Sequence, residues 1–172
     1  DANSINNLSV GDVIITEIMV NPSSVSDSKG EWFEIYNATG LDIELMGMVV
    51  SDNINDFSID ASTVVEAQSH LVIGAESDLN VNGGAPVLYS SSWNAYLSNS
   101  GSDYIAIAGT LGELDRVAFD ATWPHASGVS MQLGAGHYTP LDNDDVSSWC
   151  SASSPYGSGD LGTPGLQNAP CP

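Results

Sequence analysis

Short hydrophobic runs separated by turn-forming residues dominate the pattern of this sequence. The run at 13–20, VIITEIMV, is rich in β-branched residues and stops at Asn21-Pro22. Proline has no N–H to donate to a β ladder, so Pro22 marks the end of a predicted strand. A polar loop rich in Ser and Asp then leads to a second run at 31–37. The pattern therefore predicts two strands joined by a surface loop.

The second run alternates as a strand with two different faces would. Phe33 and Ile35 fall on one face, whereas Trp32, Glu34 and Tyr36 fall on the other. Further short runs, separated by turn-forming residues, cover 41–45, 48–51, 57–59, 63–65, 70–74, 86–89, 104–108, 113–119 and 130–133. Short strands at regular spacing predict an all-β sandwich rather than βαβ units, and no amphipathic helix is evident.

The two ends of the sequence depart from this pattern. Residues 1–10, DANSINNLSV, are polar and aperiodic. They predict an N-terminal leader that is held either by its own domain or by a neighbouring molecule. Residues 11–168 are expected to form the sandwich. From about residue 138 the chain is rich in Ser, Gly, Pro and Asp, which predicts an irregular C-terminal tail wrapped around the sandwich, with 169–172 tied back by a disulfide.

Composition adds a strong acidic imbalance, because 22 Asp and Glu residues face only 2 Lys and Arg residues and the formal net charge is −20. Such a surface repels phosphate backbones and anionic membranes, which argues against nucleic acid as a partner. No stretch approaches the roughly 20 apolar residues that span a bilayer, so membrane insertion is not expected. Two interpretations of the acidity stay open. It provides solubility in a salty exterior, or divalent cations offset it in the fold or an assembly.

The two cysteines of the chain, Cys150 and Cys171, lie in the predicted tail. In an acidic, turn-rich sequence they are expected to form one disulfide, which implies an oxidising compartment outside the cell or at its surface. Closing this loop would contribute about 3 kcal/mol in the chain-entropy description. Two free, buried cysteines are the alternative. No signal peptide is present, so the chain is expected to be a mature secreted product or an excised domain.

A series of motifs recurs in a recognisable order between about residues 11 and 168. They are 15–18 (ITEI) with Asn21-Pro22, 30–37 (GEWFEIYN), Leu45 with Gly47, 49–52 (VVSD), 71–73 (LVI), 97–103 (LSNSGSD) with 105–107 (IAI), Asp115 with Val117, Trp123-Pro124, 130–133 (SMQL), Trp149, and 162–165 (GTPG) with Asn168. Their order and spacing resemble the lamin tail domain family, found in nuclear lamins and many secreted bacterial proteins. The resemblance implies an immunoglobulin-like β-sandwich. It also implies a non-catalytic module, often attached in bacteria to secreted nucleases, phosphatases or surface proteins, and transfers no catalytic residues.

Motifs of known enzymes are missing from the sequence. It contains no G-x-S-x-G elbow, no H-E-x-x-H and no Gly-rich phosphate loop ending in lysine. The three histidines, His70, His125 and His137, match no zinc spacing. With so many Ser and Asp residues, sequence-level triads carry no information, since triads are recognised by geometry. We therefore expect no enzymatic activity.

Calcium is the one inorganic partner that the sequence favours, because it takes six to eight oxygen ligands from carboxylates, amides and carbonyls. Two clusters offer such groups. The denser is Asp142, Asn143, Asp144 and Asp145, and the second is Asp52, Asn53, Asn55 and Asp56. A solvated turn, in which Asp and Asn bond their own backbone, is the alternative for each. Glu17, Glu31 and Glu34 form a third candidate group, if neighbouring strands bring them together.

Two further residues have both a structural and a functional interpretation. Trp93 lies in a polar loop, where it would either be an ordinary exposed aromatic residue or stack on a sugar. Lys29 would either be solvated or form an isopeptide cross-link to an Asn or Asp, as in some bacterial immunoglobulin-like modules. Trp32, Trp123 and Trp149 are expected to pack in or beside the core.

The sequence as a whole predicts a non-catalytic, extracellular structural module. In the first hypothesis it is stabilised by calcium and associates with itself through edge strands into a surface layer or filament, or binds another extracellular protein. In the alternative it binds a glycan or a surface polymer as an appendage of secreted or cell-surface proteins.

Overall fold

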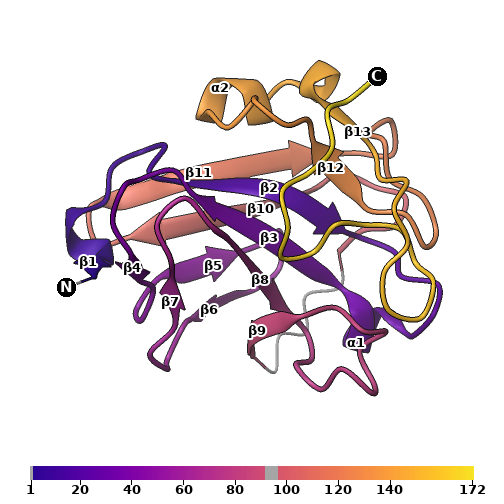
Figure 1. The fold of residues 1–172 in the computed structure, drawn as a ribbon, viewed down its shortest axis with the longest axis horizontal. Coiled ribbons are helices and arrows are strands. Elements are labelled where there is room, and N and C mark those ends of the chain that lie inside the picture. The colour runs from indigo at the N-terminus through magenta and orange to yellow at the C-terminus, as the bar shows by residue number, and fades with distance from the viewer. Residues whose placement is uncertain (1, 92–96) are drawn as a thin grey trace.

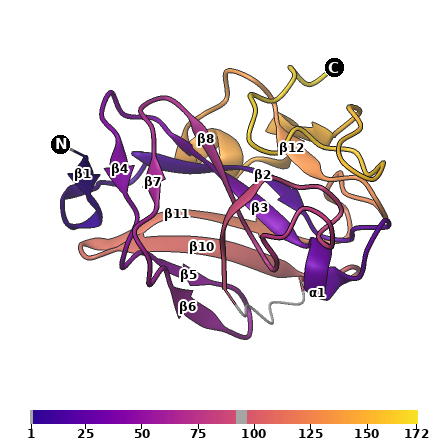
Figure 2. The same ribbon diagram turned by 60° about the horizontal axis from the view of Figure 1, so that its bottom comes forward.

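The chain folds into two β-sheets packed face to face, with a small third sheet beside them (Figures 1 and 2). The computed structural model describes residues 2–91 and 97–172. In spatial order, the larger sheet contains β13 (Trp149–Ser151), β12 (Met131–Leu133), β2 (Val13–Met19), β3 (Trp32–Asn37), β8 (His70–Gly74) and β9 (Val87–Ser90). The second contains β11 (Gly112–Phe119), β10 (Asp103–Gly109), β5 (Val49–Ser51) and β6 (Asp56–Ser58). The third contains β1 (Asn3–Ser4), β4 (Ile43–Glu44) and β7 (Val64–Val65).

Helical structure is confined to single turns in the described residues. They are η1 (Ile5–Asn7), α1 (Asp27–Gly30), α2 (Pro140–Asn143) and η2 (Val146–Ser148). The predicted all-β class is therefore confirmed, and every hydrophobic run of the sequence corresponds to a strand. No helix in these residues is long and apolar enough to cross a membrane.

The main core lies between the two larger sheets. Phe33 and Ile35 of β3 point into it, as the alternation predicted, and both are fully buried. Trp32 points to the opposite face of the sheet, called the outer face below, where it packs with Met19 and Val72 in a second, smaller apolar cluster. The larger sheet is therefore buried on both faces, although only one of them meets another sheet.

Strand β2 carries a bulge that bears directly on the outer face. The pairing with β3 joins Ile15 to Ile35 and Glu17 to Glu34, so Thr16 is an extra residue on β2. A bulge of this kind locally bends the strand and redirects side chains. Here it brings Thr16 and Glu17 together opposite Glu34.

The N-terminal leader is held by its own domain. Ile5 and Leu8 are buried in the main core. Strand β1 pairs in parallel with β4, and the Asn3 amide donates to the Asp42 carbonyl over 2.6 Å. Of the two expectations for the leader, the structure therefore has the intramolecular one.

The C-terminal tail comprises residues 138–172, and its last part crosses the outer face (yellow in Figures 1 and 2). It is less irregular than predicted, because it contributes α2, η2 and strand β13, which pairs with β12. A disulfide joins Cys150 of β13 to Cys171, with the Cα atoms 5.6 Å apart. This disulfide holds the end of the tail beside β13.

Candidate functional site: buried carboxylates and an apolar groove

Glu17 and Glu34 form a buried pair on the outer face, called the Glu17–Glu34 pair below. They are direct neighbours on β2 and β3, and neither residue is exposed to solvent. Glu34 Oε1 accepts hydrogen bonds from Thr16 Oγ1 (2.7 Å) and His70 Nδ1 (2.9 Å). Its second oxygen, Oε2, accepts from the Gly165 amide (2.7 Å). Three separate segments, among them the tail, therefore converge on one carboxylate.

Glu17 connects the same face to the tail. Its carboxylate accepts from the Thr163 amide (2.9 Å), from Thr163 Oγ1 (3.0 Å) and from Ser130 Oγ. Asn168 completes the closure, because its Nδ2 donates to the Thr16 carbonyl at the bulge (2.8 Å) and to the Leu133 carbonyl (3.0 Å). The tail therefore supplies the hydrogen-bond donor for the carbonyl of Thr16, the bulged residue.

Burial changes the proton affinity of Glu17. Desolvation, assisted by the nearby Glu34 charge, raises the pKa of Glu17 from 4.5 to about 8, although the hydrogen bonds from Ser130 and Thr163 oppose the shift. A buried carboxylate with a raised pKa also occurs in active sites. Here, however, the tail covers both groups, and neither lines a described cavity.

Five other carboxylates are buried in residues 2–91 and 97–172, and each binds donors of its own chain. Glu31 accepts from the Leu97 amide (3.1 Å), and burial raises its pKa to about 9. Asp115 accepts from the Ile15 amide (2.7 Å), and burial raises its pKa to about 6. Asp160 accepts hydrogen bonds from Ser23 and Ser24. Burial alone would raise the pKa of Asp160, but these hydrogen bonds outweigh burial and lower it. The remaining two, Asp52 and Asp103, accept backbone amides at 2.6–2.8 Å.

Of the three glutamates in the third candidate group, the structure brings two together. Glu17 and Glu34 are paired, whereas Glu31 holds the segment at Leu97. Sequence reasoning missed that the tail is their partner. The Gly-Thr-Pro-Gly motif with Asn168 was the available signal, because small residues and amide side chains suit close contact with buried polar groups.

The first predicted calcium cluster is divided between several local roles. Asn143 is buried, and its Nδ2 donates to Asp115 Oδ2 (2.6 Å) and to the Ile15 carbonyl (3.2 Å). Asp142 accepts from Thr139 Oγ1 (2.7 Å), and Asp145 caps η2 through the Ser147 amide (2.9 Å). The Asp144 carboxylate, whose pKa burial raises, borders a surface hollow with Glu113.

The second cluster surrounds a shallow hollow of about 270 Å³ with Tyr104. Asp52 Oδ1 accepts from the Ile54 and Asn55 amides (2.7 and 2.6 Å), which is a turn bonded to itself. Asn53 Nδ2 donates to the Ser102 carbonyl (3.3 Å), and Asp56 begins β6. No group of three or more His, Cys, Asp or Glu side chains in residues 2–91 and 97–172 has metal-binding geometry. Calcium binding stays a prediction.

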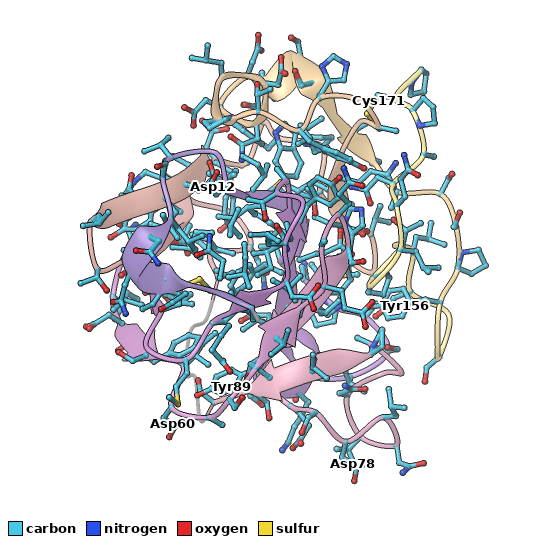
Figure 3. The ribbon with its side chains drawn as sticks, turned by 60° about the vertical axis from the view of Figure 1, so that its left-hand side comes forward. Asp12, Asp60, Asp78, Tyr89, Tyr156 and Cys171 are labelled. Carbon is cyan, nitrogen blue, oxygen red and sulfur yellow. A yellow bond between two sulfur atoms is a disulfide. The ribbon has the colours of Figure 1, made fainter. Side chains whose placement is uncertain are left out.

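The other predicted residues fall in different places. Trp93 lies outside the described residues. Lys29 forms an ion pair with Glu76 (Nζ to Oε2, 2.8 Å), and the isopeptide cross-link stays a prediction. Trp32 and Trp149 are buried, and Trp123 packs against the core, as expected. On the outer face, Trp32 Nε1 donates to the hydroxyl of Tyr156 (3.0 Å), which the tail supplies (Figure 3).

Beside the Glu17–Glu34 pair lies an open groove of about 570 Å³. Strands β7, β8 and β9 and the tail segment around Pro164 form it, and it is called the groove below. Its lining is mainly apolar and includes Val64, Val72, Leu88 and Leu166. His70, whose ring is fixed by Glu34, and Glu66 are among its polar residues.

The fold and these motifs agree with a comparison to known families. The sequence model of the lamin tail domain matches residues 6–121, which is more than half of the chain. This chain belongs to the lamin tail domain family. The family is an immunoglobulin-like, non-catalytic domain, which agrees with the sandwich. A search of curated proteins finds no match.

The matched span ends before the residues that close the outer face. It includes β2, β3 and β8, and with them Glu17, Glu34 and His70. The donors Ser130, Thr163 and Asn168 lie beyond it. In this lamin tail domain, therefore, the segment that covers the buried pair follows the matched region.

Proposed function

We propose that this lamin tail domain is a non-catalytic structural module of the cell exterior, and that it attaches another molecule through its surface. One observation carries the proposal. All seven buried carboxylates in the described residues accept hydrogen bonds from donors of the same chain. They are Glu17, Glu31, Glu34, Asp52, Asp103, Asp115 and Asp160. The groups best suited to acid–base chemistry thus fasten loops and the tail.

Two properties support a place outside the cell. The disulfide between Cys150 and Cys171 persists in oxidising compartments and is rare where thiols are kept reduced. The net charge of −20 maintains solubility, and at physiological salt exposed charges are screened over about 8 Å.

The groove favours attachment of a different molecule over contact between copies. It is apolar and open, whereas two copies at −20 each repel one another. Self-association into a layer or filament is the second candidate. The same acidity favours it only where divalent cations, such as calcium at the 52–56 and 142–145 loops, offset the repulsion.

Fractionation of the producing cells tests the proposal. Under non-reducing conditions, with free thiols alkylated, the protein should be recovered from the medium or the cell surface with its disulfide intact. It should elute in a complex larger than its own 17.9 kDa. Recovery from the cell interior with two alkylated cysteines, or as a free monomer in all fractions, would contradict it.

Light scattering of the purified protein separates the two candidates. A module that attaches a different molecule stays monomeric with millimolar calcium, whereas a self-assembling module forms oligomers that EDTA disperses. A glycan-binding module would instead be retained on polysaccharide resins, with or without calcium. The Trp93→Ala variant would no longer be retained.

A further inference from the structure

The groove differs from the surrounding surface because exposed apolar side chains meet there from three separate parts of the chain. Leu88 of β9 is 63% exposed, Val64 of β7 is 40% exposed and Leu166 of the tail is 67% exposed. All three line the same hollow. A concave surface of several hundred Å³ with a mainly apolar lining is the usual form of a binding site.

The polar side chains of the lining include His70 and Glu66. The ring of His70 is held by the hydrogen bond between its Nδ1 and Glu34 Oε1 (2.9 Å). Glu66 adds a carboxylate to the lining. A ligand that complements these groups carries N–H donors or positive charge.

Acidic residues also lie behind the walls of the groove. Glu44 is the neighbour of Val64 across the β4–β7 pairing, and Asp42 Oδ1 accepts from the Ala67 amide next to Glu66. Asp60 accepts from the hydroxyl of Tyr89 (2.9 Å; Figure 3), but Tyr89 points from β9 into the main core, away from Leu88. The acids beside Val64 and Glu66, together with the net charge of −20, make the potential around the groove negative.

No positive side chain of the protein balances this charge. The sequence contains two basic residues, Lys29 and Arg116. Lys29 is paired with Glu76, and Arg116 is paired with Glu113 and lies over the Tyr104 ring at 4.1 Å. Neither lines the groove.

We propose that the groove binds a positively charged peptide segment of a partner protein, in which lysine or arginine recurs between apolar residues. The apolar side chains cover Leu88, Val64 and Leu166, and the cations meet Glu66 and the acids behind the walls. The inference rests on the proposed attachment function and names the class of partner. A second copy of the chain does not fit, because it brings 22 acidic and 2 basic residues.

A fluorescently labelled peptide of three Lys-Pro-Leu repeats, titrated by fluorescence anisotropy, tests the proposal. Its prolines keep it extended and prevent self-pairing. Matched peptides replace every Lys by Glu, or every Leu by Ser. The first peptide should bind with an affinity that falls as salt rises, and both replacements should abolish binding. Amide chemical shifts should change at the groove residues.

Variants locate the contact. Leu88→Asp combined with Leu166→Asp should weaken binding at least about tenfold. The control pair Leu111→Asp with Leu141→Asp has the same charge change at leucines that are 73% and 86% exposed and lie outside the groove, and it should leave affinity nearly unchanged. Glu66→Gln should weaken binding, whereas Asp78→Asn should not.

Each contrary result overturns the inference. The inference fails if the Lys peptide does not bind, or if the Glu peptide binds equally well. It also fails if the two leucine pairs lose affinity equally. A dimer in light scattering that Leu88→Asp disrupts would also overturn it, because a second copy would then occupy the groove. If a native complex is recovered from the cell surface but groove variants leave it intact, the inference fails while the proposed function stands.

Discussion

The two faces of the six-stranded sheet are both buried, but by different chemistry. On the inner face, Phe33 and Ile35 pack against apolar residues of the second sheet. On the outer face, the Glu17–Glu34 pair depends on individual donors such as Thr163 and Gly165 of the tail. An apolar contact is non-directional and accepts many partners of suitable volume. A buried carboxylate is stable only when specific groups bond it, so the outer face is the more specific of the two.

The largest effect should come from the inner face. Phe33→Ala removes a fully buried ring, and a cavity of this kind costs about 4 kcal/mol of unfolding free energy. Guanidinium unfolding followed by circular dichroism measures the loss. A loss under about 1.5 kcal/mol would mean that the two sheets can close over the cavity.

The disulfide tests how firmly the outer face is closed. Replacing both Cys150 and Cys171 by Ser should cost about 3 kcal/mol, since the unfolded chain regains the freedom of the closed loop. Hydrogen exchange should accelerate most at the Thr163 and Gly165 amides, which the tail presents to the buried pair. Equal acceleration in β3 and β10 would show that the tail does not open on its own.

Asn168 tests the specificity of the outer face with a single side chain. Asn168→Ala leaves the Thr16 and Leu133 carbonyls without their donor, which should cost about 2 kcal/mol. The neighbouring Gln167→Ala, at an exposed position, is the matched control and should change stability by less than about 0.5 kcal/mol. Equal losses would contradict the role assigned to Asn168.

The two faces should also respond differently to pH. The folded state binds the Glu17 proton more tightly than the unfolded chain does, so this contribution is complete below pH 4.5 and is lost as the pH rises towards 8. Glu31, with a pKa of about 9, acts in the same direction. Stability should therefore fall as the pH rises from 5 to 9.

Thermal unfolding at several pH values, in high salt to screen surface repulsion, measures this slope. Glu17→Gln should flatten it. Glu66→Gln makes the same change of charge at an exposed position and should leave it unaltered. A slope that both variants reduce equally would assign the pH dependence to net charge.

Calcium should have the smallest effect. If the 142–145 or 52–56 loop binds it, millimolar calcium should raise stability by about 1 kcal/mol, because a ligand that binds only the folded state stabilises it. Asp144→Asn or Asp56→Asn should then remove the increase. If EDTA and added calcium both leave the melting temperature unchanged, the calcium prediction is wrong.

The inner face was largely predictable from the sequence. Alternation assigned Phe33 and Ile35 to one face, and the hydrophobic runs located strands such as His70–Gly74 at their observed bounds. These features are local, since a strand's pattern reports which side is buried.

The outer face was not predictable in the same way. The bulge at Thr16 is invisible in the hydrophobic pattern, because register depends on the neighbouring strand. The donors of Glu17 lie 113 and 146 positions away, at Ser130 and Thr163. A glutamate in a strand normally indicates a solvated face, and only the tertiary structure shows that the tail covers it.

The order of these contacts along the chain has a consequence for how the molecule reaches its final form. Glu17 and Glu34 are synthesised early because they lie near the N-terminus, whereas the residues that cover them are synthesised last, in the tail. Until that segment docks, water solvates both carboxylates, so the sheet can form without enclosing a charge. Dehydration of the pair then becomes a late step that requires a complete C-terminus. A chain cut short before Thr163 would retain its apolar core and yet present an acidic, unfinished surface.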